Sequence, residues 1–225
     1  MSTITVLGAG AMGSAICTPL ADAGWDVRLW GTWLDDHLLD AIERGENHPR
    51  TNQPFVQGVT LYRSSELDEA LEGADTVIVS VASVGVEQVV KMALPGIVKA
   101  DALMVTSKGF LELDNGDVLL LPDSIRRIAA DEGYDNLPPI IAVAGPVKAN
   151  ACAAREPTAT IFGCKDLDVA IKYARAIRTD NYAIETTDDE TGVEICAPMK
   201  NVFAIALGIA DGLRGSAPQP QGGHI

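Results

Sequence analysis

Residues 4–13 read Ile-Thr-Val-Leu-Gly-Ala-Gly-Ala-Met-Gly, an apolar run that leads directly into a GxGxxG pattern. Residues 3–7 have the character of a buried strand, and the glycine pattern opens a helix. In that setting Gly8 permits the tight turn, Gly10 lets the backbone approach a pyrophosphate, and Gly13 lets the helix pack closely. An ordinary glycine-rich turn is the alternative. The position between a strand and a helix N-terminus favours a dinucleotide-binding loop.

The composition limits the class of protein. The chain has 225 residues, 47% of them hydrophobic, which suits one large domain or one domain and part of another. The net charge is −14, so the chain would repel nucleic acid and anionic membranes. We therefore expect neither of them as a partner. We expect no apolar run long enough to cross a membrane, and no signal peptide before the glycine loop. Four cysteines without a CxxC pair predict no metal site and free thiols in a reducing cytoplasm.

Strand and helix signals alternate along the chain. Strands are expected at 26–30, 59–62, 75–81, 103–106, 140–144, 158–162 and 182–185, and helices at 11–23, 34–44, 64–71, 84–98, 118–132 and 167–178. Continuous apolar strands that alternate with helices are typical of a parallel sheet covered on both faces. We therefore expect an α/β fold with a Rossmann-type, doubly wound parallel sheet.

The character of the sequence changes at residue 187. A helical stretch covers about residues 188–213, with acidic residues in its first turn and Pro198 expected to bend it. We expect residues 1–186 to form the dinucleotide-binding domain. Residues 187–225 would then hold the first helix of a second, all-helical domain that is incomplete, followed by a tail without periodicity.

Two short motifs each follow a predicted buried strand directly. These are Ser107-Lys108-Gly109 and Gly145-Pro146. Because ligands bind beyond the carboxyl ends of the strands in open α/β sheets, both motifs should lie beside the glycine loop. A solvated loop lysine and a simple turn are the alternatives. The shared edge of the sheet favours a functional role for Lys108 and for Gly145.

A second lysine, Lys200, lies in an otherwise apolar part of the long helix. A lysine that snorkels to the surface is the alternative, but burying a charged lysine without a function is costly. A partly desolvated lysine beside another cation has a lowered pKa and can protonate an alkoxide near neutral pH. Lys108 is a candidate for that second cation. Lys200 is therefore a candidate general acid or base.

Five motifs occur in order along the chain: GAGAMGSA at 8–15, LWG at 29–31, SKG at 107–109, AGP at 144–146 and KNVFAIALGIADGL at 200–213. With these motifs the chain resembles the NAD(P)-dependent glycerol-3-phosphate dehydrogenase family over nearly everything up to Leu213. The lysine followed at once by Asn-Val is the most specific part. The resemblance implies an enzyme that uses NAD or NADP to reduce dihydroxyacetone phosphate to sn-glycerol 3-phosphate, a phospholipid precursor in bacteria.

The resemblance also implies roles for individual residues. Lys200 looks like the proton donor or acceptor, and Lys108 would share in catalysis by touching both cofactor and substrate. The implied cofactor contacts are Gly8, Gly10, Ala11, Met12, Gly13, Thr32, Lys108 and Ala149, and the implied substrate contacts are Lys108, Gly145, Lys200 and Asn201.

The chain departs from the family pattern in three places. Val147 stands where the family usually has a polar side chain, and Gly31-Thr32-Trp33 leaves the choice between NAD and NADP open. The family's Arg–Asn pair for the substrate phosphate is not in this sequence. We therefore expect dinucleotide binding with poor turnover, from a fragment of a longer protein or a truncated gene product. Exposed apolar surface on the long helix would favour a homo-oligomer.

Two other functions stay open. Another lysine-dependent Rossmann reductase, of the ketopantoate reductase, 3-hydroxyacid dehydrogenase or 6-phosphogluconate dehydrogenase type, also has a lysine on the first long helix of its second domain. Such enzymes usually space the asparagine further along than in Lys200-Asn201. The second possibility is a non-catalytic dinucleotide-binding module.

Overall fold

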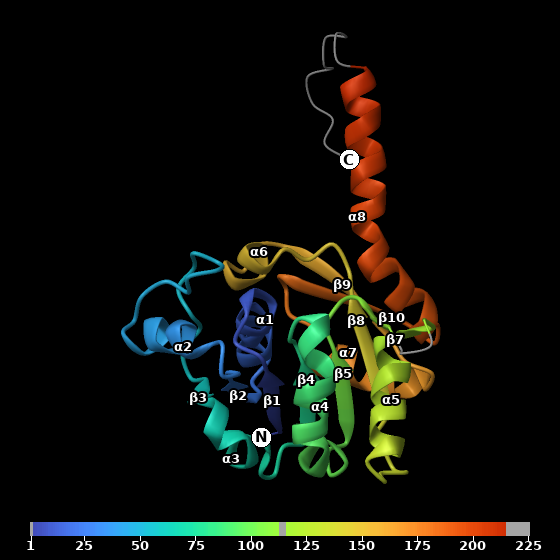
Figure 1. Ribbon diagram of the computed structural model, residues 1–225. Coiled ribbons are helices and arrows are strands. Elements are labelled where there is room, and N and C mark those ends of the chain that lie inside the picture. Colours follow the sequence, from blue (N-terminus) through green and yellow to red (C-terminus); the bar gives the residue numbers. More distant parts are fainter. Residues whose placement is uncertain (1, 113–115, 215–225) are drawn as a thin grey trace.

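Strands and helices alternate in the computed structural model, which describes residues 2–112 and 116–214 (Figure 1). The strands are β1 (Thr3–Leu7), β2 (Asp26–Trp30), β3 (Thr60–Tyr62), β4 (Thr76–Val79), β5 (Ala102–Val105), β6 (Phe110–Glu112), β7 (Val118–Leu120), β8 (Ile140–Ala144), β9 (Thr158–Gly163) and β10 (Tyr182–Thr187). The helices are α1 (Ala11–Asp22), α2 (Asp36–Glu43), η1 (Ser64–Glu66, a 3-10 turn), α3 (Leu67–Leu71), α4 (Ser83–Ile97), α5 (Leu121–Asp131), α6 (Ala149–Ala153), α7 (Leu167–Ile177) and α8 (Glu190–Leu213).

Eight strands form one sheet in the order β10-β9-β8-β5-β4-β1-β2-β3. From β3 to β8 this is the doubly wound order with every pair parallel, which confirms the expected Rossmann-type fold. The expectation of a wholly parallel sheet is wrong at one pair, because β9 runs antiparallel to β8. A parallel return needs a crossover that covers the sheet. The five-residue α6 packs on α1 instead, so the chain comes back beside β8 in the opposite direction.

A small hairpin replaces the start of one expected helix. Residues 118–132 were expected to be helical, but Val118–Leu120 form β7, which pairs antiparallel with β6. Helix α5 begins only at Leu121, with Pro122 in its first turn, where a missing N–H is harmless. The hairpin follows Lys108 directly and so belongs to the same edge of the sheet.

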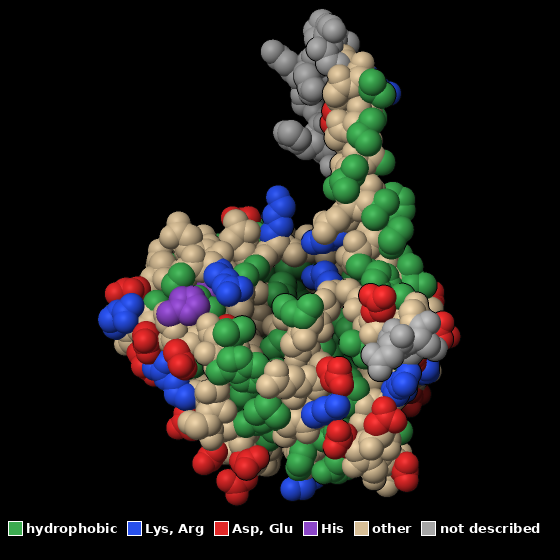
Figure 2. All heavy atoms as spheres, viewed as in Figure 1, with side chains coloured by type: hydrophobic (Ala, Val, Ile, Leu, Met, Phe, Trp, Pro, Cys, Tyr) green, Lys and Arg blue, Asp and Glu red, His purple; other side chains and the backbone are tan. Residues whose placement is uncertain are grey.

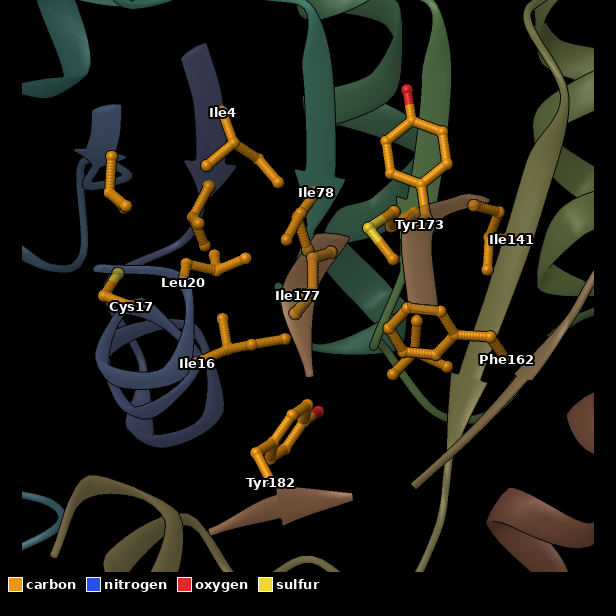
Figure 3. Close-up of a cluster of buried hydrophobic side chains, with 14 of the residues drawn as sticks. Ile4, Ile16, Cys17, Leu20, Ile78, Ile141, Phe162, Tyr173, Ile177 and Tyr182 are labelled. Carbon is orange, nitrogen blue, oxygen red and sulfur yellow. The ribbon is translucent and has the colours of Figure 1, made fainter. Parts of the chain in front are cut away.

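Two apolar layers hold the helices on the sheet. Every residue of β4, β5 and β8 is buried, as expected for strands covered on both faces. Figure 3 shows one layer, in which Ile16 and Leu20 of α1 face Ile4 of β1 and Ile78 of β4. The other layer lies under α3, α4 and α5. Each fully buried Leu or Ile contributes about 1.5–3 kcal/mol, so these layers fix the position of the loops at the sheet edge.

Helix α8 lies against the sheet only through its first turns. Glu190, Val193, Glu194 and Ala197 are buried there, whereas residues 200–214 are exposed and extend away from the domain (Figure 1). Figure 1 also shows that the helix changes direction in its lower part. Pro198 lies inside the helix and removes one backbone hydrogen bond, which agrees with the expected bend. The domain boundary at residue 186 stays a prediction.

One helix among the described residues, α8, is long and apolar enough to cross a membrane, with a mean hydropathy of 1.5. The expectation that no apolar run reaches this length is therefore wrong. The helix resembles a membrane-spanning helix in length and composition only. The first turns of α8 pack on β8 and β9.

A salt bridge fixes the start of α8 to α5. The Glu190 side chain is only 4% exposed and accepts two hydrogen bonds from the Arg126 guanidinium, at 2.8 and 2.7 Å. The ammonium of Lys165 lies 3.8 Å from the same carboxylate. Removing Arg126 would leave the buried carboxylate with the more distant lysine alone.

We expect Arg126→Ala to lower the free energy of unfolding by about 3 kcal/mol, because an unpaired buried charge is strongly destabilising. Urea unfolding at pH 7 measures the change. Arg127→Ala is the matched control, since that side chain is 53% exposed and its pair with Asp131 is a surface pair. The control should shift the unfolding free energy by about 0.5 kcal/mol or less. Equal losses in the two variants would contradict the prediction.

Candidate dinucleotide and substrate site

The three glycines of the loop meet different surroundings. Gly8 has φ +111°, and a Cβ there would lie 2.8 Å from the Ser80 carbonyl oxygen. A Cβ at Gly13 would lie 1.9 Å from the carbonyl oxygen of Gly8, so α1 could not sit this close to β1. At Gly10 the nearest atom to an added Cβ is Nη1 of Arg50, 3.9 Å away. Gly8 and Gly13 therefore serve the turn and the packing, whereas Gly10 faces open space.

The N-terminus of α1 is open toward that space. Gly10 is the N-cap, and no described side chain caps the first turn. The first-turn N–H groups, next to the partly exposed Ala11 and Met12, are therefore available to an anion. A pyrophosphate is the group that such an uncapped turn and an open Gly10 would fit.

Asp35 organises the neighbouring loop after β2. Asp35 is buried, with 7% of the residue exposed. Its Oδ2 accepts hydrogen bonds from Ala9 N at 3.2 Å, Thr32 N at 3.0 Å and Thr32 Oγ1 at 2.9 Å. Thr32 thus lies beside the glycine loop, at the predicted position past the second strand. The sequence analysis gave Asp35 no role. A lone acidic residue before a helix offers no signal for a contact with residue 9.

Arg50 comes to the glycine loop from the segment between α2 and β3. Its guanidinium is exposed and, as noted above, is the nearest group to the open side of Gly10. The sequence does not predict this position of Arg50. The nearby His48 is buried in the structure, but a histidine in a polar loop does not by itself indicate burial.

Lys108 and Gly145 lie at the same edge, as their positions after β5 and β8 predicted. A small pocket is lined by Met12, Lys108, Gly145 and Val147. Val147 also packs on the apolar core, and so does Ala149 at the start of α6, which lies on α1. The structure therefore brings Met12, Lys108 and Gly145 close together around a gap of about 10 Å³, which has room for about one water molecule.

Lys200 lies close enough to Lys108 for its charge to affect the pKa of Lys108. Burial lowers the pKa of Lys108, the charge of Lys200 lowers it further, and the charge of Glu194 raises it. The expectation that Lys200 is the desolvated lysine is wrong: Lys200 and Asn201 are exposed, and Lys108 is the half-buried one. The reason is that α8 leaves the sheet before residue 200, and no other element among the described residues covers that part of the helix.

A larger cavity of about 580 Å³ lies against α8. Gly145 and Lys200 line it, together with residues of β9 and β10. Figure 2 shows a hollow on the front face below α8, with Lys or Arg side chains at its rim. Gly145 therefore lines both this cavity and the small pocket that holds Lys108.

Glu194 is a buried acid beside the lysines that the sequence analysis did not assign. It is on the buried side of α8. Burial and the neighbouring Glu190 raise the pKa of Glu194 to about 8, although the charge of Lys108 lowers it. Among the described residues, no group of three His, Cys, Asp or Glu side chains could hold a metal ion.

Comparison with known proteins gives a consistent result. The family model described as the N-terminus of NAD-dependent glycerol-3-phosphate dehydrogenase matches residues 3–170. An NADP(+)-dependent glycerol-3-phosphate dehydrogenase of Archaeoglobus fulgidus is 35% identical over 204 residues, which are 91% of this chain and 59% of the relative. A glycerol-3-phosphate dehydrogenase (NAD(P)+) of Bacillus subtilis is 30% identical over 221 residues, 95% of this chain and 59% of the relative. The chain thus spans about 60% of the length of these curated relatives.

Solved structures agree. A glycerol-3-phosphate dehydrogenase from Coxiella burnetii superposes with a TM-score of 0.79 at 28% identity, over 96% of this chain and 63% of that one. A pyrroline-5-carboxylate reductase from the same organism gives a TM-score of 0.59 at 13% identity, a likeness of fold alone.

Proposed function

Since this chain belongs to the NAD-dependent glycerol-3-phosphate dehydrogenase family, we propose that it binds NAD(H) or NADP(H) in its glycine loop and takes part in the interconversion of dihydroxyacetone phosphate and sn-glycerol 3-phosphate. The observation that carries the proposal is that Lys108 and Gly145, which follow β5 and β8, lie close to Met12 of α1 at the edge of the sheet that holds the glycine loop. Other lysine-dependent reductases are not favoured, because the curated relatives share this enzyme name.

The dinucleotide would rest on the uncapped N-terminus of α1, over Gly10. When bound, it supplies or accepts the hydride. Lys200 would give a proton to the carbonyl oxygen of the triose as that oxygen becomes an alkoxide, and take the proton back in the reverse direction. Lys108 would hold positive charge between cofactor and substrate, while the backbone at Gly145 and the side chain of Asn201 would orient the phosphorylated triose.

The choice between the two dinucleotides forms part of the proposal. NADP(H) carries a 2′-phosphate on the ribose near the end of β2, where NAD-dependent enzymes place an acidic side chain on the hydroxyl. In this chain the Asp35 carboxylate already accepts hydrogen bonds from Ala9 and Thr32. The Asp35 carboxylate is thus occupied, and together with the NADP(+)-dependent relative this supports NADP(H).

We expect Arg50→Ala to weaken the binding of NADPH and NADH alike, about tenfold, because Arg50 lies beside Gly10 and one charge-assisted contact to the pyrophosphate of either nucleotide is lost. Fluorescence titration of both nucleotides measures the effect. Arg44→Ala is the control, since Arg44 pairs with Glu46 on the surface and should leave both affinities unchanged. Unchanged affinity for both nucleotides would contradict a role for Arg50 at the pyrophosphate.

We further propose a cytoplasmic location and self-association. All four cysteines are free, which suits a reducing compartment. Large apolar side chains are exposed along the outer part of α8: Val202, Phe203, Ile205, Leu207, Ile209 and Leu213. A contiguous apolar face of this kind supports association with a second copy of the chain or with a further part of the protein.

A further inference from the structure

The Ser107-Lys108-Gly109 motif gives only its lysine to the proposed mechanism. A lysine side chain is long and flexible, so the chain around it decides where its ammonium group can lie. Lys108 is half-buried, whereas an unrestrained loop lysine would extend into solvent. The residues on both sides of Lys108 show what restrains it.

The backbone approaches Lys108 along the pair of strands β4 and β5. The N–H of Thr106 donates to the Val79 carbonyl at 3.0 Å, and the Thr106 hydroxyl donates to Ser80 Oγ at 2.8 Å. The N–H of Ser107 reaches the same Val79 carbonyl only at 3.4 Å, beyond the usual length of such a bond. The backbone ladder therefore weakens at Ser107, one residue before the lysine.

The Ser107 side chain makes a stronger bond at the point where this ladder weakens. The residue is 6% exposed, and its Oγ donates to the Val81 carbonyl at 2.7 Å, the usual length of an O–H···O bond. The Val79 carbonyl lies farther from the same hydroxyl, at 3.4 Å. Since a hydroxyl has one hydrogen to donate, the shorter contact is the effective bond. This bond ties the end of β5 to the segment that follows β4.

Gly109 brings the chain against the same segment on the other side of the lysine. Its φ is +135°, and a Cβ there would lie 2.9 Å from Ser83 Cβ and 3.0 Å from Ser83 Oγ. The chain thus passes the start of α4 too closely for a side chain at this position. Lys108 therefore stands between two contacts with the residues that follow β4.

We propose that Ser107 is a positioning residue for Lys108: its hydroxyl ties the end of β5 to the Val81 carbonyl and so holds the lysine side chain beside Met12 and Gly145. The ammonium group then meets a nucleotide in place, without first ordering the turn that carries it. The cofactor contact that this placement serves rests on the proposed function. The placement itself is a property of the free protein.

The placement of Lys108 has an effect that can be measured without a nucleotide. Burial lowers the pKa of Lys108, the charge of Lys200 lowers it further, and the charge of Glu194 raises it. A lysine that is released into solvent loses the effect of burial, so its pKa rises toward the ordinary value of 10.5. Loss of the Ser107 bond should therefore raise the pKa of Lys108.

The first test measures the dissociation constants of NADH and NADPH for the 225-residue chain and its variants. Lys108→Ala, which removes the whole contact, should weaken both nucleotides about tenfold or more. Ser107→Ala leaves Lys108 in place in only a fraction of molecules, so both affinities should fall about threefold to tenfold. The double variant should bind no more weakly than Lys108→Ala alone, because both changes act on one interaction.

Two conservative variants isolate the hydroxyl. Ser107→Thr keeps an O–H donor, so nucleotide binding should recover to within about twofold of the wild type. Ser107→Cys has a similar shape but only a weak donor, so it should behave like Ser107→Ala. Thermal unfolding of each variant reports whether the domain is intact. The Thr and Cys variants provide the comparison if the alanine variant does not fold.

Ser124→Ala is the matched control. Ser124 is fully buried, and its hydroxyl donates to a backbone carbonyl, that of Leu120, at 2.9 Å. Its removal should cost about 1 kcal/mol of stability, as for Ser107→Ala, because one buried hydrogen bond is lost in each case. Nucleotide affinity should nevertheless stay as in the wild type, since the Ser124 bond lies within α5.

The second test measures the pKa of Lys108 in the free protein. The rate at which acetic anhydride acetylates Lys108 is followed against pH by mass spectrometry, with a short lysine peptide as internal standard. The pKa of Lys108 should be higher in Ser107→Ala and Ser107→Cys than in the wild type, and unchanged in Ser107→Thr and Ser124→Ala. A merely structural role for Ser107 would not produce this pattern.

The outcomes separate the inference from the proposed function. If the wild type binds neither nucleotide, the proposed function fails, and the acetylation test still decides whether Ser107 places Lys108. If Lys108→Ala weakens binding but Ser107→Ala does not, the positioning role alone fails. An unchanged pKa of Lys108 in Ser107→Ala and Ser107→Cys, or a folded Ser107→Thr variant that binds as weakly as Ser107→Ala, would also overturn the inference.

Discussion

Gly13→Ala is expected to abolish dinucleotide binding and to lower the free energy of unfolding by about 3 kcal/mol or more. The added Cβ would lie 1.9 Å from the Gly8 carbonyl oxygen, a backbone atom that cannot turn aside, and 3.3 Å from Ser80 Cβ. Helix α1 would have to move away from β1. That movement would also displace the first-turn N–H groups that face the cofactor space.

Gly10→Ala is the matched control for this prediction. Its Cβ would meet no atom closer than 3.9 Å, so the domain should unfold at the same urea concentration as the wild type. The methyl group would nevertheless occupy the space that a pyrophosphate approaches, so nucleotide binding should weaken about tenfold or more. Urea unfolding and nucleotide titration of both variants measure these effects. A stable Gly13→Ala domain that binds NADPH normally would contradict the assignment of the loop.

The features that the sequence predicts well are local. The turn, the close approach and the helix packing are each encoded by one glycine within six residues, and each buried strand is a continuous apolar run. Lys108 and Gly145 could be placed because each follows such a strand directly. By contrast, the direction of β9 depends on how α6 packs on α1, and the β6–β7 hairpin consists of two strands of three residues each.

The site residues that the sequence analysis missed depend on contacts between distant segments. Asp35 bonds the N–H of Ala9, 26 residues away, and His48 bonds the carbonyl of the same residue, 39 residues away. Neither residue type is unusual for its loop. The burial of Lys200 was predicted wrongly for a related reason: apolar neighbours in sequence do not show whether another element covers that stretch of the helix.

Lys200→Ala is expected to have the largest effect on chemistry. Loss of a general acid should lower turnover by about 10²–10⁴-fold. Because this chain spans about 60% of its curated relatives, turnover is best measured in a chimera that continues with the remaining part of the Archaeoglobus fulgidus enzyme. Stability and cofactor binding of the 225-residue chain should not change, since the Lys200 side chain is exposed. Lys99→Ala, another exposed lysine, is the control and should retain full turnover.

The comparison with Lys108→Ala decides which lysine carries the proton. Lys108 lines the pocket with Met12 and Gly145, so its loss should weaken cofactor binding as well as turnover. Lys200→Ala should affect turnover alone. If Lys200→Ala kept its turnover while Lys108→Ala lost it, Lys200 would not be the proton donor. The proton would then belong to Lys108, because this is the lysine whose pKa the fold lowers by burial.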